Sequence, residues 1–171
     1  MELKELTDRT LELFGVADPG QLGPALLTAC RDYDRLCAFR DLVSGDLATD
    51  WMQKIYQYYL ADRKEKKQDY TPVSVARFMS MLVSDSGEVV DMCAGSGALI
   101  IQKWSQNPDT LFTAIEYDET VIPFLLFNMV LRNIRCFVFH KNALTDDEPL
   151  GFWEIKKGEE FGNLIDIKST L

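Results

Sequence analysis

The sequence contains little of the chemistry on which several common enzyme classes depend. It has one histidine, His140, and four cysteines, none of which forms a Cys-x-x-Cys pair. Structural zinc sites and cysteine–histidine nucleophilic catalysis need such residues in numbers and spacings that are missing here. We therefore predict no metal site, and we expect the cysteines to be free and mostly buried thiols.

Long apolar runs are also missing. No stretch approaches the ~20 apolar residues that a membrane-spanning helix needs. The first five residues, Met1 to Glu5, are charged where a signal peptide would be apolar. We therefore predict no membrane association and a cytoplasmic location. A chain of 171 residues, 47% apolar and 26% charged, fits one globular domain or a small domain with a helical extension.

Positive charge is scarce, because 18 Lys and Arg residues face 27 Asp and Glu residues and leave a net charge of −9. An acidic chain repels the phosphate backbone, so it is a poor nucleic-acid binder on its own. The basic run at 63–67 is better explained as a solvated helix C-terminus that complements the helix dipole. DNA is therefore expected as a partner only together with additional subunits.

The most informative pattern that is present is the stretch 88–101, which predicts a short buried strand, a tight glycine turn and the start of a helix. Two adjacent valines favour the strand, and Asp91 stands at its end. Gly95 and Gly97 lack the Cβ atoms that would keep the backbone away from a ligand. The helix that follows offers unpaired N–H groups. Together these features predict a nucleoside cofactor.

The rest of the chain predicts an α/β fold preceded by helices. Apolar residues at helical spacing predict helices over 2–14, 22–40, 51–67, 73–83, 98–106 and 121–131. The third is opened by Asp50 or an earlier residue, and the last has Thr120 as its N-cap. The helix over 22–40 is expected to turn Cys30, Tyr33 and Cys37 inward. Strands are predicted over 88–91, 111–116 and 134–139, in an order that makes a parallel sheet with right-handed crossovers.

The pattern is less regular in the C-terminal tail and at the boundary between the helices and the sheet. Short strands near 153–155 and 164–167 are either a hairpin or a degraded fourth strand. Pro72 cannot continue the preceding helix, so we divide the chain into a helical region, 1–67, and a cofactor-binding domain, 68–171. So small a sheet leaves an exposed edge strand unless the tail or a homodimer covers it.

Two cofactor classes use a strand, a glycine turn and a helix. A dinucleotide-binding turn has a third small residue where this chain has Ile100, and Asp91 would repel a pyrophosphate. S-adenosylmethionine carries an ammonium and a sulfonium group, which suit a carboxylate. Glu116, at the end of the second strand, can accept hydrogen bonds from both hydroxyls of a ribose. The residues therefore favour S-adenosylmethionine over NAD.

Five motifs together resemble the adenine-specific amino-methyltransferases of DNA, most closely the modification subunits of type I restriction systems. They are Gln68–Pro72, Asp91–Gly97, Glu116, Asn128-Met129 and Asn142–Leu144. The resemblance implies a partial S-adenosylmethionine-dependent methyltransferase (Rossmann-like) sheet with an N-terminal helical extension. It also implies DNA methylation within a restriction–modification system, and a partner chain of a methylase complex.

The resemblance implies which residues would bind the methionine part of the cofactor. Tyr70 and Thr71 match the motif that lies against the methionine end. Asp91, Gly95 and Gly97 match the glycine turn near the methionine amino group. The turn would be lined by Cys93, Ala94 and Ser96.

The adenosine part of the cofactor is assigned by the same resemblance. Glu116 matches the acid that binds the ribose, and Tyr117 beside it would pack on the adenine ring. Asn142 matches the polar residue that reads the adenine amine, and it is followed by Ala143 and Leu144.

The catalytic motif of this family is not found, so no catalytic residue is assigned. The motif is Asn, Asp or Ser followed by Pro-Pro and an aromatic residue, which hold the target amine and stack on the flipped base. The six prolines of this chain are never adjacent, and Asp166 is a weak substitute. Three functions stay open: a DNA methylase completed by a partner or a second copy, a non-catalytic cofactor-binding regulatory or assembly subunit, and a methyltransferase for a non-DNA acceptor.

Overall fold

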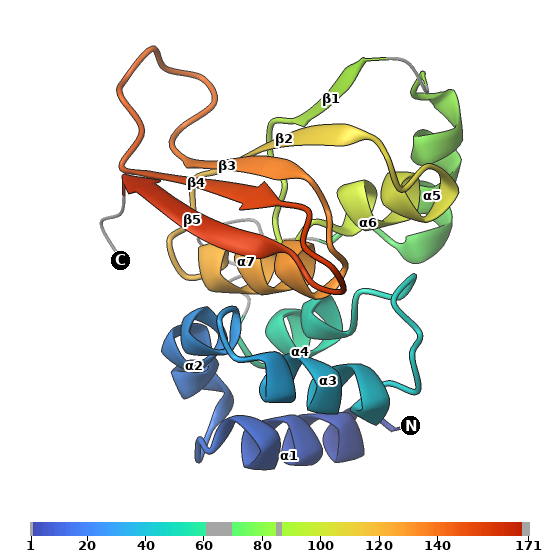
Figure 1. Ribbon diagram of the computed structural model, residues 1–171, viewed down its shortest axis with the longest axis vertical. Coiled ribbons are helices and arrows are strands. Elements are labelled where there is room, and N and C mark those ends of the chain that lie inside the picture. The colour runs from blue at the N-terminus through green and yellow to red at the C-terminus, as the bar shows by residue number, and fades with distance from the viewer. Residues whose placement is uncertain (1, 61–69, 85–86, 169–171) are drawn as a thin grey trace.

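The computed structural model describes residues 2–60, 70–84 and 87–168, and it has an α/β architecture built in layers (Figure 1). The helices are α1 (Leu3–Phe14), the 3₁₀ turn η1 (Pro19–Gln21), α2 (Leu22–Ala29), α3 (Tyr33–Leu42), α4 (Trp51–Tyr59), α5 (Val73–Leu82), α6 (Ala98–Gln106) and α7 (Ile122–Leu131). The strands are β1 (Glu88–Asp91), β2 (Leu111–Glu116), β3 (Cys136–His140), β4 (Gly151–Lys156) and β5 (Asn163–Lys168). Among the described helices, none has the length and apolar character needed to cross a membrane.

The five strands form one sheet in the order β1-β2-β3-β4-β5. The first three are parallel, with Glu116 of β2 paired with His140 of β3. The last two are antiparallel to their neighbours. The parallel order of the first three strands is confirmed, and of the two alternatives for the tail the hairpin is correct. The tail therefore covers the outer edge of β3, and the α/β architecture agrees with the expected partial methyltransferase sheet.

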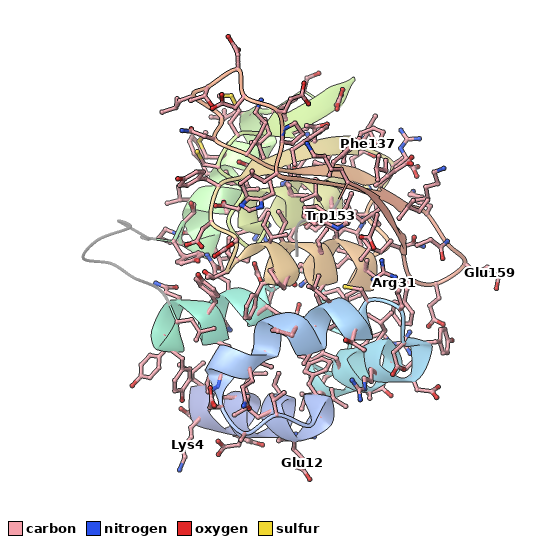
Figure 2. The ribbon with its side chains drawn as sticks, turned by 90° about the vertical axis from the view of Figure 1, so that its left-hand side faces the viewer. Lys4, Glu12, Arg31, Phe137, Trp153 and Glu159 are labelled. Carbon is pink, nitrogen blue, oxygen red and sulfur yellow. The ribbon has the colours of Figure 1, made fainter. Side chains whose placement is uncertain are left out.

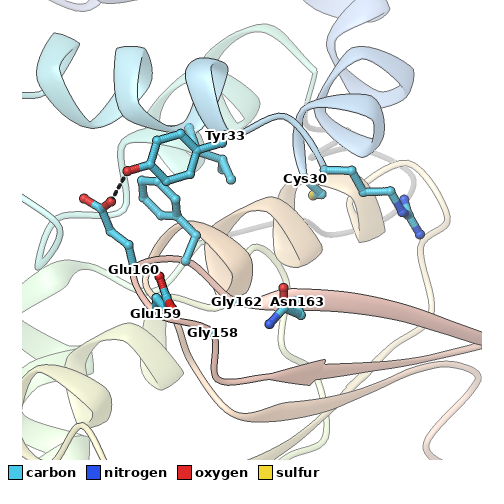
Figure 3. Close-up of a pocket in the computed structure, with 10 residues that line it drawn as sticks. Cys30, Tyr33, Gly158, Glu159, Glu160, Gly162 and Asn163 are labelled. Carbon is cyan, nitrogen blue, oxygen red and sulfur yellow. Dashed lines mark hydrogen bonds between the residues drawn. The ribbon is translucent and has the colours of Figure 1, made fainter.

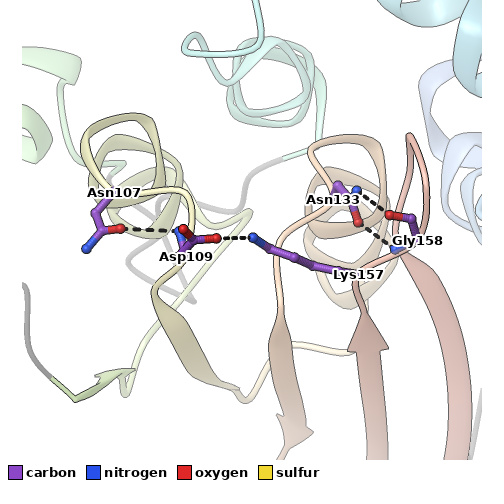
Figure 4. Close-up of polar contacts among 5 residues, drawn as sticks. All are labelled: Asn107, Asp109, Asn133, Lys157 and Gly158. Carbon is purple, nitrogen blue, oxygen red and sulfur yellow. Dashed lines mark hydrogen bonds and ion pairs between the residues drawn. The ribbon is translucent and has the colours of Figure 1, made fainter.

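The hairpin is tied to the loops that precede β2 and β3 (Figure 4). Lys157 Nζ lies 2.5 Å from Asp109 Oδ1. The side chain of Asn133 donates to the Gly158 carbonyl at 3.0 Å and accepts from the Gly158 N–H at 2.9 Å. These contacts fix the turn between β4 and β5 against the parallel strands.

The core lies between the sheet and the N-terminal helices, with α7 in the middle (Figure 1). All ten residues of α7 are buried, because the sheet packs on one side of the helix and α2 and α4 pack on the other. Trp153 of β4 is buried on the side of the sheet that faces α7, whereas Phe137 of β3 lies on the opposite side (Figure 2). The predicted boundary at 67/68 and the basic run at 63–67 both lie outside the described residues, so the division into two parts remains a proposal.

One predicted helix is wrong. The stretch 22–40 forms two helices, because the side chain of Asp32 accepts a hydrogen bond from Arg35 N at 3.1 Å and caps a new helix. The axis changes direction there, and Tyr33 is 58% exposed instead of facing inward. Cys30 and Cys37 consequently lie on different helices.

The starts of α7 and β3 differ by one or two residues from the prediction. The N-cap of α7 is Val121 and not Thr120, so Pro123 is the second helical residue. The Thr120 hydroxyl lies 2.6 Å from the Tyr56 hydroxyl instead. Strand β3 begins at Cys136, two residues later than predicted.

The four cysteines are free thiols with different environments. Cys30 and Cys136 are buried, Cys37 is half-buried and Cys93 is exposed at the glycine turn. Burial raises the pKa of Cys30 to about 12, which keeps this thiol protonated and unreactive at neutral pH.

Candidate functional site

The carboxyl ends of the parallel strands gather the polar residues singled out in the sequence. Asp91 closes β1 and pairs with Ala114, two residues before Glu116 at the end of β2. Asn142 follows β3, and Lys141 N beside it donates to the Glu116 carbonyl at 2.9 Å. Parallel strands end at one edge of their sheet, so Asp91, Glu116 and Asn142 share the edge where open α/β sheets bind ligands.

The glycine turn after β1 is held in shape by Glu116. Gly95 and Gly97 have φ values of +55° and +96°, which favour glycine. The Glu116 carboxylate accepts from the N–H groups of Gly95 at 2.7 Å, Tyr117 at 2.8 Å and Asp118 at 2.7 Å. A carboxylate has about four acceptor positions, so Glu116 organises the turn and keeps capacity for one more donor.

Asp91 lies beside this turn, and one of its two carboxylate oxygens accepts no hydrogen bond from the described residues. Its Oδ1 accepts from Cys93 N at 3.2 Å. Its Oδ2 is buried, and no donor among the described residues lies within hydrogen-bonding distance of it. Burial raises the pKa of Asp91, the Cys93 N–H opposes this rise, and the nearby charge of Glu116 adds to it. A buried carboxylate oxygen without a donor destabilises the protein unless a cationic ligand supplies one.

Tyr70 covers the glycine turn from the side of α4. A Cβ atom on Gly95 would lie 3.6 Å from Tyr70 Cε1. The Tyr70 ring packs edge-on against Tyr56 with ring centroids 5.9 Å apart, and burial raises the pKa of the Tyr70 hydroxyl far above its usual range. The carbonyl of Thr71 accepts from Gln53 Nε2 at 3.4 Å, which joins this segment to α4.

The residues assigned to the adenosine part lie at the ends of β2 and β3. Tyr117 is exposed, and its carbonyl accepts from Nε2 of the buried His140 at 3.1 Å. Asn142 Oδ1 accepts from Leu144 N at 3.0 Å and closes a tight turn that contains Ala143. Leu144 itself is 93% exposed. This strand edge is therefore open to solvent beside Tyr117 and Leu144.

A buried polar network behind the turn went unpredicted. We call it the Asp50 network, and it consists of Asp50, Ser96, Asn128 and Arg132. Ser96 Oγ donates to Asp50 Oδ2 at 2.7 Å, and Asn128 Nδ2 donates to Asp50 Oδ1 at 2.9 Å. Arg132 donates to Asn128 Oδ1 at 2.8 Å. The Ser96 side chain is thus buried against Asp50 and braces the turn from inside. The sequence shows Asp50 only as an N-cap, which it also is, because it accepts from Gln53 N at 2.8 Å.

Gly97 makes room for α7. A Cβ atom on Gly97 would lie 2.7 Å from Met129 Cε and 3.1 Å from Leu125 Cδ1. The prediction that the missing Cβ clears space for a ligand is therefore corrected at this position: the space is filled by the helix that packs on the turn.

Replacing Gly97 with alanine should lower the free energy of unfolding by about 2 kcal/mol, because the new methyl group adds a clash to a left-handed backbone. Gly15→Ala is the matched control, since Gly15 has φ +68° and no atom within 4 Å of its ideal Cβ. It should cost about 1 kcal/mol. Urea unfolding of both variants measures the difference, and equal costs would contradict the role assigned to the contact with α7.

A separate hollow of about 360 Å³ lies between the start of α3 and the turn of the β4–β5 hairpin (Figure 3). The Tyr33 hydroxyl donates there to Glu160, which also pairs with Arg40. Arg31 pairs with Asp166 at 2.6 Å. These charged groups already satisfy one another, and none of the predicted cofactor residues lines the hollow. The edge formed by β1 and β2 is the better ligand site.

Comparison with known proteins identifies the family of the chain. The family model described as N-6 DNA Methylase matches residues 47–157. No curated protein and no solved structure matches the chain. The matched segment includes Asp50, the glycine turn, Glu116 and Asn142, and it covers well over half of the chain. The chain therefore belongs to the N-6 DNA methylase family.

Proposed function

We propose that the chain binds S-adenosylmethionine at the carboxyl ends of β1 and β2, as the cofactor-binding part of an adenine-specific DNA methylase of a restriction–modification system. The observation that carries the proposal is the buried Asp91 Oδ2, which no donor among the described residues satisfies. An ammonium group provides both the donor and the charge that this oxygen needs.

Each part of the edge has a task in this proposal. Asp91 and the N–H groups of the glycine turn would hold the methionine end, with Tyr70 covering it. Glu116 would use its remaining acceptor position for a ribose hydroxyl. Tyr117, which is exposed, would pack on the adenine ring beside Asn142. Cys93, Ala94, Ala143 and Leu144 complete the proposed lining, and Ser96 would act through its backbone because its side chain bonds Asp50.

Binding and methyl transfer are separate steps in this proposal. When bound, the cofactor supplies an activated methyl group on its sulfonium centre. The chain's residues would bind and orient that group, which is the main task in an in-line transfer. The Asn/Asp-Pro-Pro-aromatic sequence that would hold the target amine is missing. A non-catalytic regulatory or assembly subunit that binds the same cofactor is the second candidate.

Thermal unfolding tests whether the cofactor binds at all. At S-adenosylmethionine about 100-fold above its Kd, binding to the native state adds about 2.7 kcal/mol of stability. For a chain of this size, the melting temperature should then rise by about 5–10 °C. The demethylated product should give a similar rise, whereas NAD should give none. A flat response to both methionine-derived ligands would contradict the proposal.

A further inference from the structure

The segment that leads into α4, residues 47–50, is held along its length by side chains from α6 and from the end of α7. Arg132, which directly follows α7, donates to two of its carbonyls, from Nε to Leu47 at 2.7 Å and from Nη2 to Thr49 at 2.9 Å. Gln102 of α6 donates to the carbonyl between them at 2.6 Å. Both side chains are buried, so the two helices fix this part of the backbone. We call it the 47–50 segment.

Asp50, the last residue of the segment, connects it to the glycine turn. Its Oδ2 accepts from Ser96 Oγ at 2.7 Å, and its Oδ1 accepts from Asn128 Nδ2 at 2.9 Å. Asn128 Nδ2 also donates to the Ser96 carbonyl at 2.8 Å. Ser96 stands between Gly95 and Gly97, the two glycines of the turn with positive φ. The centre of the turn is therefore held through both the side chain and the carbonyl of one residue.

The glycine turn needs support from outside because its own sequence does not restrict its backbone. A glycine loses more backbone freedom on ordering than any other residue, and this turn contains two. A ligand that must order a loop as it binds has a lower affinity than one that meets the loop already ordered. Glu116 holds the turn at Gly95 N, and the Asp50 network holds it at Ser96. Both contacts should therefore raise the affinity of the turn for a ligand.

Stability alone does not explain a buried network that contains a carboxylate and a guanidinium group. Well-packed apolar side chains of similar volume often stabilise a protein as much as buried charges do, or more. The network instead gives the turn directed hydrogen bonds, which specify one position of its backbone. The family match also begins at residue 47, the first residue of the 47–50 segment. These observations connect the segment with the turn as well as with the helices that precede it.

We propose that the 47–50 segment positions the glycine turn for S-adenosylmethionine, with Asp50 and Asn128 as positioning residues that act through Ser96. The inference rests on the proposed function, because the cofactor is the ligand whose affinity the segment sets. Asp50 and Asn128 are buried behind Ser96, so they influence the cofactor only through the backbone of the turn. The proposed site then depends on a part of the N-terminal helical region that none of its predicted ligand contacts includes.

Asn128→Ala removes both hydrogen bonds that tie Asp50 and the Ser96 carbonyl to α7. The Kd for S-adenosylmethionine should rise about tenfold, which is a typical coupling between two parts of a protein. Asn133→Ala is the matched control, since Asn133 also makes two hydrogen bonds to the backbone, at Gly158 beyond the opposite end of the parallel strands. It should also destabilise the protein but leave the Kd within about twofold of the parent. Titration calorimetry measures each Kd at a temperature at which circular dichroism shows the variant to be folded.

Asp50→Asn separates the geometry of the network from its charge. The new amide oxygen can accept from Gln53 N and Asn128 Nδ2, which both donate to Asp50 Oδ1. The amide nitrogen can donate to Ser96 Oγ, in place of the hydrogen bond that Asp50 Oδ2 accepts. We therefore expect a Kd about tenfold above the parent for Asp50→Ala and a restored Kd, within about twofold of the parent, for Asp50→Asn. Equal losses would mean that charge and not position controls binding, and would overturn the inference. Asn128→Ala decides alone if Asp50→Ala does not fold.

Amide hydrogen exchange of the ligand-free protein tests the segment without the cofactor. The Gly97 N–H donates to the Ala94 carbonyl at 2.8 Å, so its exchange reports local opening of the turn. Asn128→Ala should speed exchange at Gly97 about tenfold relative to Val138 in β3. Asn133→Ala should leave this ratio unchanged. An unchanged ratio in Asn128→Ala, or an unchanged Kd where the parent binds the cofactor, would overturn the inference alone. A parent that does not bind S-adenosylmethionine would overturn the proposed function, and the exchange ratio would still decide whether the segment holds the turn.

Discussion

Replacing Asp91 with asparagine should reduce the thermal stabilisation by S-adenosylmethionine to about half or less, without lowering the stability of the free protein. Asp91 is half-buried, and its buried Oδ2 has no donor among the described residues. Removing the charge therefore removes a desolvation cost from the free protein. A hydrogen bond to a charged group contributes about 1.5–3 kcal/mol, so the Kd should rise about 10- to 150-fold. Titration calorimetry of the variant measures this change.

Glu88→Gln is the matched control for Asp91→Asn. Glu88 is a carboxylate at the opposite end of the same strand, where it accepts a hydrogen bond from Thr113. Its substitution should leave the affinity for S-adenosylmethionine unchanged. Equal losses in both variants would mean that net charge, and not the position of Asp91, controls binding.

The pH dependence of cofactor binding and of stability is a second test of the role of Asp91. Because burial raises its pKa, the carboxylate becomes protonated at a higher pH than an exposed aspartate. Binding of a cationic ligand should be strongest above this raised pKa and weaken as the pH falls through it. The stability of the free protein should change in the opposite direction, since a raised acid pKa favours the native state at lower pH. Asp91→Asn should remove both dependences.

Replacing Asp50 with alanine should lower the free energy of unfolding by about 3–5 kcal/mol, as the loss of a buried ionic partner does. The variant leaves Ser96 Oγ and Gln53 N without their acceptor, and Asn128 Nδ2 keeps only its hydrogen bond to the Ser96 carbonyl. It also removes the charge that helps to hold Arg132 protonated, whose pKa burial lowers to about 10. Chemical denaturation monitored by circular dichroism measures the cost.

Asp32→Ala separates the Asp50 network from simple helix capping. Asp32 is also an aspartate N-cap, but it is half exposed, and its ion pair with Arg35 is at the surface. Its loss should cost about 1 kcal/mol. If Asp50→Ala costs no more than Asp32→Ala, then the Asp50 network contributes nothing beyond a cap.

The parts of the fold that depend on local sequence were predictable. Strand β2 over 111–116 and the turn after Asp91 follow from apolar runs bounded by glycine and charge. The break between α2 and α3 was missed because Asp32 interrupts a continuous apolar period without a glycine or proline. The Asp50 network joins residues up to 82 positions apart, from Asp50 to Arg132. No local spacing encodes such a contact, since it exists only once α4 and α7 pack together.

The two edges of the sheet also differ in how far the sequence predicts them. The order of the predicted elements indicates that β1 is the first of the parallel strands. The sequence does not predict that the hairpin covers β3, or that no described strand pairs with the other edge of β1; this required the register of β4, which pairs Trp153 with Val138. The exposed side chains of α5, such as Met79, look like an ordinary apolar helix face in the sequence, and only the structure shows them uncovered.

The most direct test of the proposed cofactor site is an amide chemical-shift titration of the labelled protein with S-adenosylmethionine up to about 1 mM, within the usual range for enzyme ligands. Saturable shifts are predicted for Cys93, Gly95, Gly97 and Tyr117, whereas Gly158, in the hollow beside α3, should not move. Shifts confined to the surroundings of Gly158, or no shifts at any ligand concentration, would contradict the account.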